Sequence, residues 1–256
     1  MGVLDDFSLE GKIALVTGAA RGLGQGIATG LAEAGADVAA LDVAPLDETR
    51  EKVAALGRGF HPMNVNLLET KAKLAADIVG ECVAELGSLD ILVNNAGIIR
   101  RAPALEFGEE DWDDVVQTNL SAAFYLSQAA ARHFVEVGRG GKIINTASVL
   151  SSQGGITVPS YAATKAGIAN LTRALANEWA PLGINVNAIA PSYYTTELTS
   201  AIRQDVERSE ALLVRIPAGR YGEPEDLKGA VVFLASNAAD FVHGAILPVD
   251  GGWLAR

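Results

Sequence analysis

The sequence predicts one α/β domain in which a parallel β-sheet carries helices on both faces. Three observations lead to this prediction. Short apolar, β-branched segments alternate with longer amphipathic segments along the whole chain. The apolar segments are nearly continuous, as in strands that are buried on both sides. Connections are short, and no Pro-, Gly- or Ser-rich linker divides the 256 residues, so we expect a single domain over residues 1–256.

Seven segments are predicted as strands, at residues 12–17, 37–42, 59–64, 91–94, 142–147, 185–190 and 245–249. Helical patterns lie between them, at about residues 22–34, 48–56, 71–86, 110–137, 161–180 and 224–236. This alternation predicts a doubly wound, seven-stranded parallel sheet. The longest irregular stretch, about residues 191–220, is typical of a lid or substrate loop.

Composition excludes several classes of protein. Hydrophobic residues make up 49% of the chain and charged residues 20%, which is enough apolar material for a core. The net charge of −11 argues against nucleic-acid and anionic-membrane partners. The N-terminus has no signal-peptide pattern and no apolar run spans a bilayer, so we expect a cytoplasmic protein. A single cysteine excludes an intrachain disulfide, and the three scattered histidines predict no metal site.

A glycine pattern joins the first predicted strand to the first helix: Gly18-x-x-x-Gly22-x-Gly24. Glycines at such a turn let the backbone approach a pyrophosphate and direct free helix N–H groups toward it. A plain structural turn would look similar, but the preceding strand, the following helix and an acidic residue after the second strand favour a dinucleotide-binding Rossmann fold.

The acidic residue is Asp42, 18 positions after Gly24, where a carboxylate accepts hydrogen bonds from the adenosine ribose. A 2′-phosphate at this place would meet like charge, so NAD is favoured over NADP. Arg21, inside the glycine turn, is the residue that would instead grip a 2′-phosphate. At the end of the fourth strand, Asn94-Asn95-Ala96-Gly97 offers small and amide side chains that hold neighbouring strands beside the adenosine.

The catalytic prediction rests on Tyr161 and Lys165, which share one face of a helix. An ammonium nearby, with the positive charge of an oxidised nicotinamide beside it, is expected to lower the pKa of the phenol, so that the phenol exchanges a proton while hydride moves. Ser148 follows the fifth strand, where ligands sit in parallel sheets, and its hydroxyl is expected to bind the substrate oxygen. Ser151 and Ser152 are weaker competitors for that role.

Taken together, these motifs resemble the short-chain dehydrogenase/reductase family over the whole chain, with Pro191, Thr196 and Asn119 matching as well. The resemblance implies that Tyr161 is the general acid/base and that Asn119 supports a water-mediated proton relay. It also implies that Lys165 binds the nicotinamide ribose. The residues expected to contact the cofactor are Gly18, Arg21, Gly22, Leu23, Gly24, Asp42, Asn64, Val65, Asn95, Ala96, Gly97, Tyr161, Lys165, Pro191, Tyr194 and Thr196.

Two positions depart from the family pattern. Ser192 follows Pro191 where the family usually has Gly, and its side chain is expected to reshape the loop under the nicotinamide. Asn64 stands in place of the usual Asp at the end of the third strand, which puts an adenine contact in doubt.

A closer resemblance is to the sugar-acid branch of the family. It rests on segments including 97–101, 111–114, 215–220 and 250–256. The resemblance implies a substrate of the 2-dehydro-3-deoxy-D-gluconate or 2-deoxy-D-gluconate type. A sugar acid needs a cation for its carboxylate, for which Arg101 is the first choice and Arg100 and Arg220 are alternatives. Gln153 is expected to bind a hydroxyl. Tyr193 and Tyr194 either close over the nicotinamide or pack the loop.

Other functions stay open from the sequence. One is reduction of another carbonyl, such as a 3-oxoacyl-acyl-carrier protein, gluconate or a polyol. Another is a regulatory protein that binds NAD without catalysis, and a scaffold subunit is a third. Family membership implies a homotetramer or dimer, with the helices at 110–137 and 161–180 facing a second copy.

Overall fold

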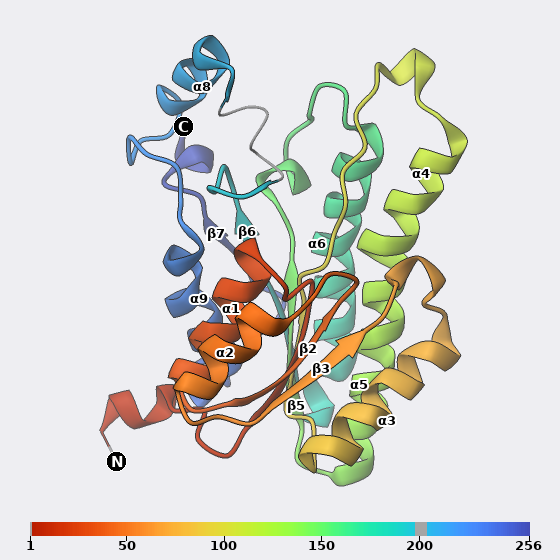
Figure 1. Ribbon diagram of the computed structural model, residues 1–256, viewed down its shortest axis with the longest axis vertical. Helices are drawn as coiled ribbons and strands as arrows, with labels where there is room; N and C mark the ends of the chain where they lie inside the picture. Colours follow the sequence, from red (N-terminus) through yellow and green to blue (C-terminus); the bar gives the residue numbers. More distant parts are fainter. Residues whose placement is uncertain (1, 198–203) are drawn as a thin grey trace.

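A computed structural model describes residues 2–197 and 204–256, and its centre is a twisted parallel sheet between two layers of helices (Figure 1). The strand order is β3-β2-β1-β4-β5-β6-β7. Every pair of neighbours is parallel. The strands are β1 (Ile13–Thr17), β2 (Asp37–Asp42), β3 (Phe60–Asn64), β4 (Ile91–Asn94), β5 (Gly141–Thr146), β6 (Ile184–Pro191) and β7 (Ile246–Val249). The predicted doubly wound, seven-stranded sheet is confirmed.

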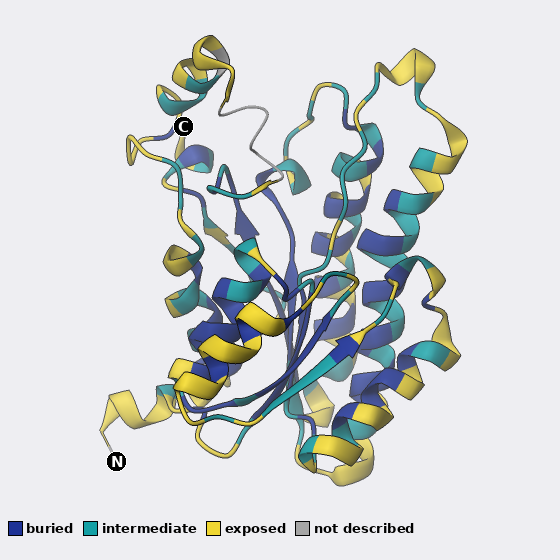
Figure 2. Cartoon of the chain, in the orientation of Figure 1, coloured by how far each residue is buried: buried dark blue, intermediate teal, exposed yellow. Residues whose placement is uncertain are grey.

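Two apolar cores form because successive side chains of a strand point to opposite faces of the sheet. Ala14 and Val16 of β1 belong to one core. Ile13 and Leu15 of the same strand belong to the other. Strands buried in this way have no polar face, which explains their nearly continuous apolar sequences. Figure 2 shows the central strands and the inward helix faces as buried, whereas the edge strands β3 and β7 are mostly of intermediate exposure.

The first core is covered by α1 (Gly22–Glu33), α2 (Asp47–Ala55) and α9 (Lys228–Ala235) (Figure 1). The second is covered by α3 (Ala72–Leu86), α5 (Ala122–Val137) and α6 (Pro159–Trp179). Among the described residues, no helix is both apolar and long enough to span a bilayer.

The structure differs from the sequence predictions at two places. The helix expected over residues 110–137 is divided into α4 (Glu109–Val116), a π-helical turn (Gln117–Ser121) and α5. The irregular stretch expected at 191–220 contains a helix, α8 (Val206–Leu213), and part of it lies outside the described residues. Of the other expected elements, each strand end lies within one residue of its prediction.

The topology determines where a ligand can bind. The chain adds β2 and β3 on one side of β1 and then crosses to β4 on the other side. Such a reversal leaves a crevice at the carboxyl ends of the two central strands. The glycine turn follows β1, and the Asn95–Gly97 segment follows β4, so both lie at this edge.

Candidate active site

The turn after β1 needs glycine at three positions. Gly18 has a φ of +67° and Gly22 a φ of +56°, both in the left-handed region that glycine adopts without strain. A Cβ on Gly24 would overlap the carbonyl oxygen of Gly18. Within the described structure, the N-cap residue Arg21 makes no side-chain capping bond to α1, which leaves the first N–H groups for an anion. Leu23 lies in this first turn, and Thr196 lies against Gly22.

The segment after β4 is tied to the glycine turn. The hydroxyl of Thr17 accepts hydrogen bonds from the N–H groups of Asn95 and Ala96, at 3.0 Å each. The side-chain amide of Asn95 donates to the carbonyls of Thr17 and Gly18, at 3.1 and 3.2 Å. The segment therefore holds neighbouring strands together, as its sequence predicts.

Asp42 ends β2 with both carboxylate oxygens engaged by backbone. One accepts from the N–H of Ala20 at 2.9 Å and the other from the N–H of Ala44 at 3.0 Å. These bonds hold a negative charge beside the glycine turn. Arg21, the competing residue for a 2′-phosphate, forms an ion pair with Glu197 at 2.7 Å.

The end of β3 supports the same edge. Asn64 pairs with Asp42 in the sheet register, and its amide donates to the carbonyl of Val43 at 3.1 Å. The N–H of Val65 donates to the carbonyl of Asp42 at 3.2 Å. The Asn64 side chain thus braces the chain after β2, which is a structural use that its sequence position does not reveal.

Ser148 and Tyr161 are brought together after β5 and at the start of α6, and their hydroxyls are hydrogen-bonded. The Ser148 oxygen also accepts from the N–H of Leu150 at 3.1 Å, so the proton of this serine is left to donate. The competing serines are used elsewhere. Ser151 donates to the carbonyl of Lys165 at 2.7 Å, and Ser152 donates to that of Val149 at 3.2 Å.

Lys165 is 4% exposed, and its ammonium donates to the carbonyl of Thr146 at 2.6 Å. Its Nζ lies 5.5 Å from the centre of the Tyr161 ring, so the two residues do not form a surface pair. Burial lowers the pKa of Lys165 to about 8. The ammonium form still dominates at neutral pH.

The expected lowering of the phenol pKa depends on the nicotinamide charge as well as on Lys165, and the charges of the chain alone do not produce it. Burial raises the pKa of Tyr161, and this effect outweighs the opposing effects of the Ser148 hydrogen bond and the Arg101 charge. The physical reason is that transfer from water to an apolar site disfavours the charged form.

Asn119 lies in the π-helical turn, a feature that is common at functional sites. Its amide exchanges two hydrogen bonds with the backbone of Ile98: Oδ1 accepts from the N–H at 2.8 Å, and Nδ2 donates to the carbonyl at 2.9 Å. A Cβ on Gly97 would lie 3.2 Å from the Asn119 amide oxygen and 3.7 Å from the Lys165 ammonium. Asn119 is therefore near the predicted site.

The three candidate arginines differ in their partners. Arg100 forms ion pairs with Asp111 at 3.1 Å and Asp114 at 3.3 Å. Arg220 makes two hydrogen bonds to Asp226, at 2.6 and 2.9 Å, and holds the pKa of that carboxyl at about 2. Arg101 is the one of the three whose charge acts on Tyr161.

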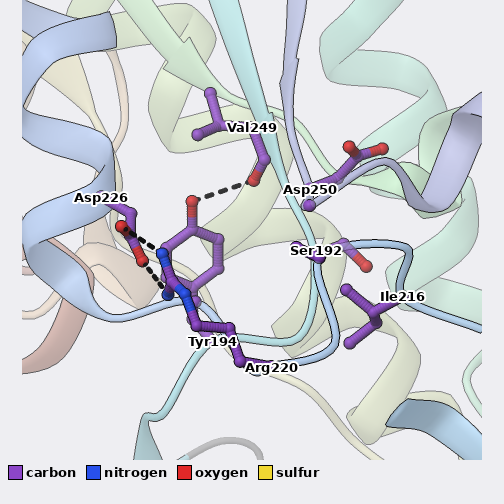
Figure 3. Close-up of a pocket in the computed structure, with 10 residues that line it drawn as sticks. Ser192, Tyr194, Ile216, Arg220, Asp226, Val249 and Asp250 are labelled. Atoms are coloured by element: carbon purple, nitrogen blue, oxygen red, sulfur yellow. Dashed lines mark hydrogen bonds and ion pairs between the residues drawn. The ribbon is translucent and has the colours of Figure 1, made fainter. Parts of the chain in front are cut away.

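The segment after β6 lines a pocket with Ser192 and Tyr194 (Figure 3). Pro191 is the last residue of β6, and the hydroxyl of Tyr194 donates to the carbonyl of Val249 at 2.9 Å. The Tyr194 ring is buried in the first core, so its side chain packs the loop. Tyr193 has a φ of +49° and turns its ring toward Trp253, with ring centres 4.6 Å apart.

A cavity of about 270 Å³ lies under this segment, and its described lining includes Ser192, Tyr194, Arg220 and Asp250 but none of Ser148, Tyr161 and Lys165. The Ser192 hydroxyl is buried and has no hydrogen-bond partner among the described residues. The serine side chain therefore adds a polar group beside this cavity.

Sequence reasoning missed a contact between Gln153, which is predicted to bind substrate, and the C-terminal segment. The indole N–H of Trp253 donates to the side-chain oxygen of Gln153 at 2.9 Å. The two residues are 100 positions apart, so no local pattern reports this contact.

The chain is similar over nearly its whole length to known proteins. The family described as enoyl-(acyl carrier protein) reductase matches residues 18–254. The 2-dehydro-3-deoxy-D-gluconate 5-dehydrogenase of Escherichia coli (strain K12) is 56% identical over 254 residues, which cover 99% of this chain and 100% of the relative.

Two solved structures are similar over nearly the full length. A protein from Agrobacterium tumefaciens, proposed to be a 2-deoxy-D-gluconate 3-dehydrogenase and solved with bound NADP, is 54% identical with a TM-score of 0.91, covering 98% of this chain and 100% of that one. A gluconate 5-dehydrogenase from Burkholderia cenocepacia, in complex with NADP and tartrate, is 41% identical with a TM-score of 0.91, covering 100% of both chains. The chain belongs to the short-chain dehydrogenase/reductase family of oxidoreductases.

Proposed function

We propose that the protein is an NAD-dependent dehydrogenase that interconverts a secondary hydroxyl and a ketone on a sugar acid. The observation that carries this proposal is the cluster of Ser148, Tyr161 and Lys165, which lies near the Asn95–Gly97 segment that is bonded to the glycine turn. The names of the relatives support a substrate of the 2-dehydro-3-deoxy-D-gluconate or 2-deoxy-D-gluconate type.

The residues present fit a nicotinamide dinucleotide. The turn leaves no space for a Cβ at Gly24. The free N–H groups at the N-terminus of α1 can bind a pyrophosphate. Asp42 would accept the adenosine ribose hydroxyls. When bound, the dinucleotide supplies the acceptor or donor of hydride.

Tyr161 carries the proton in this proposal. In alcohol oxidation, the phenolate takes the hydroxyl proton of the substrate as hydride leaves the carbon, and in ketone reduction the phenol returns it. Ser148 donates its one hydroxyl proton to the substrate oxygen and so stabilises the charge that develops there. Because burial raises the pKa of Tyr161, the chain needs further positive charge to form phenolate near neutral pH. The oxidised nicotinamide carries such a charge.

Lys165 and Asn119 support this step. We assign the ammonium of Lys165, which is buried and donates to the carbonyl of Thr146, to the nicotinamide ribose. The Asn119 side chain and the Lys165 ammonium both lie near Gly97, and we assign them to a water-mediated proton relay to Tyr161.

The substrate carboxylate is assigned to Arg101. Of the three candidate arginines, Arg101 is the one whose charge acts on the Tyr161 phenol. Gln153, in the segment between Ser148 and Tyr161, is assigned to a substrate oxygen.

We assign NAD rather than NADP because the Asp42 carboxylate, fixed by two backbone N–H groups, would repel a 2′-phosphate. Because both solved relatives described above hold NADP, the cofactor preference is tested by direct comparison of the two dinucleotides.

The deciding experiment is a panel of aldonic acids, ketodeoxy acids, polyols and a 3-oxoacyl thioester, each tested with NAD and NADP. We expect turnover of a sugar acid with NAD, lost in Tyr161→Phe by about 10²–10⁴-fold. Preferred reduction of the thioester would favour the acyl-carrier-protein alternative. A Tyr161→Phe variant with full turnover, or a wild type inert on the whole panel, would favour a non-catalytic NAD-binding role.

We also propose a homotetramer or dimer in the cytoplasm. An apolar groove on the outer side of α5 and α6 has a volume of about 490 Å³ and is lined by residues that include Phe124, Tyr125 and Leu171. Two copies related by a twofold axis can cover this groove with the same residues of each partner. A monomer in light scattering at micromolar concentration would contradict this assignment.

A further inference from the structure

We infer that Trp253 is a positioning residue for substrate binding: it fixes the side-chain amide of Gln153 so that the NH₂ group donates hydrogen bonds to the sugar acid. This inference rests on the proposed function and specifies how Gln153 acts in it. The first observation is the 2.9 Å hydrogen bond from the indole Nε1 to the Gln153 Oε1.

Chemistry gives this bond a direction. An indole N–H can only donate, so Gln153 has to present its oxygen to Trp253. The amide group is planar, and holding the oxygen leaves the Nε2 group, with two N–H donors, for other partners. Gln153 is therefore a donor to the substrate, matched to a keto, hydroxyl or carboxylate oxygen.

Trp253 is itself held from several sides. It is 4% exposed and packs in a cluster with Val149, the residue that follows Ser148. The Tyr193 ring lies with its centre 4.6 Å away, and the Arg215 guanidinium lies 4.0 Å from the indole centre. One side chain thus joins the segments that follow β5, β6 and α8.

The chain around Trp253 is built to hold it in place. The Asp250 carboxylate accepts from the N–H of Gly252 at 2.8 Å and from that of Leu254 at 2.9 Å. The N–H of Ala218 donates to the carbonyl of Gly251 at 3.0 Å. A rigid support of this kind is what keeps a ligand-binding amide in one orientation.

The test is a double-mutant cycle on Trp253→Phe and Gln153→Ala. Phenylalanine keeps an aromatic ring in the cluster and removes only the N–H donor and part of the ring area. We expect Trp253→Phe to raise the KM for the sugar acid about five- to tenfold, with a smaller change in kcat and unchanged NADH affinity. In the Gln153→Ala background the same substitution should have almost no effect on KM, because the group it positions is gone.

Trp112→Phe is the matched control, since Trp112 is an exposed tryptophan on α4 and should leave KM unchanged. Equal effects of Trp253→Phe with and without Gln153, or a parallel loss of NADH affinity, would overturn the inference and leave Trp253 a packing residue. A wild type that acts only on other alcohols or ketones would refute the sugar-acid proposal, and the cycle is then read on that substrate. A wild type inert on every substrate would overturn both.

Discussion

Replacement of Asp42 by asparagine tests the cofactor assignment most directly. The substitution keeps the shape of the side chain and removes its charge. A 2′-phosphate about 4 Å from the carboxylate would be repelled by ~1 kcal/mol in a fully hydrated site and by ~4 kcal/mol at an effective dielectric constant of 20. Asp42 is of intermediate exposure, so we take about 2 kcal/mol, which corresponds to roughly 30-fold in affinity.

The assay is the ratio of kcat/KM for NADP to that for NAD, measured with the same sugar acid. We expect NAD to be preferred by the wild type, and Asp42→Asn to raise the NADP/NAD ratio by about 30-fold. The variant also loses one of two backbone contacts, because an amide NH₂ cannot accept from the N–H of Ala20 or Ala44. That loss costs about 1–3 kcal/mol of stability and is measured separately by urea unfolding.

Asp37→Asn is the matched control. Asp37 begins the strand that Asp42 ends, and its carboxylate accepts from the N–H of Gly59 at 2.7 Å. The Asp37→Asn substitution removes the same charge from the opposite edge of the sheet, so it should leave the NADP/NAD ratio of kcat/KM unchanged. A wild type that prefers NADP, or an Asp42→Asn variant with an unaltered ratio, refutes the reasoning from the carboxylate.

Three further predictions concern the effect of Lys165 on stability, the role of Arg101 in substrate binding, and the role of Gly24 in cofactor binding. Because the pKa of Lys165 is lowered to about 8 from 10.5, the folded state binds fewer protons than the unfolded state between these pH values, and this group's contribution to stability increases as pH rises through that window. The difference in unfolding free energy between wild type and Lys165→Met should therefore move by about 3 kcal/mol in favour of the wild type from pH 7 to 10.5, and a pH-independent difference contradicts the shift. Arg101→Met should raise the KM for a sugar acid about tenfold and leave the KM for a neutral polyol unchanged. Arg100→Met removes a cation that is bound to Asp111 and Asp114, and it should change either KM less than about twofold. Equal effects of the two variants on the KM for the sugar acid would refute the assignment of Arg101. Gly24→Ala should abolish NADH binding in a fluorescence titration, because the added Cβ overlaps the Gly18 carbonyl. The control is Gly80→Ala, at an open position of α3, which should stabilise the protein by about 0.5–1 kcal/mol in urea unfolding. Retained NADH binding by Gly24→Ala would show that the turn can rearrange and would contradict the prediction.

Local sequence patterns were sufficient to predict the bounds of the strands. β2 and β4 have the bounds that their apolar segments predict, because a strand buried on both faces needs continuous apolar residues. The helix α8 was not predicted. Leu212 and Leu213 pack against the cluster of Val149, Ile216 and Trp253, so its apolar side is covered by residues distant in sequence.

The π-helical turn at Asn119 is a second feature that the local sequence did not predict. A π turn adds one residue to a helical segment, and the residue types around it are those of an ordinary helix. The sequence alone indicated a structural amide, and the family resemblance was needed to select Asn119. Its bonds to Ile98 and its position near Gly97 become visible only in the folded chain.

The sequence by itself determined the seven strands, most of the helices and the glycine turn, and it supplied the prediction that Ser148, Tyr161 and Lys165 form one group. These depend on residue types and spacings that are written along the chain. The tertiary structure decided the direction of the Tyr161 pKa shift, which of three arginines acts on the phenol, and the contact between Trp253 and Gln153. Burial, charge proximity and long-range hydrogen bonds depend on distances through space, and those exist only once the sheet brings its strand ends to one edge.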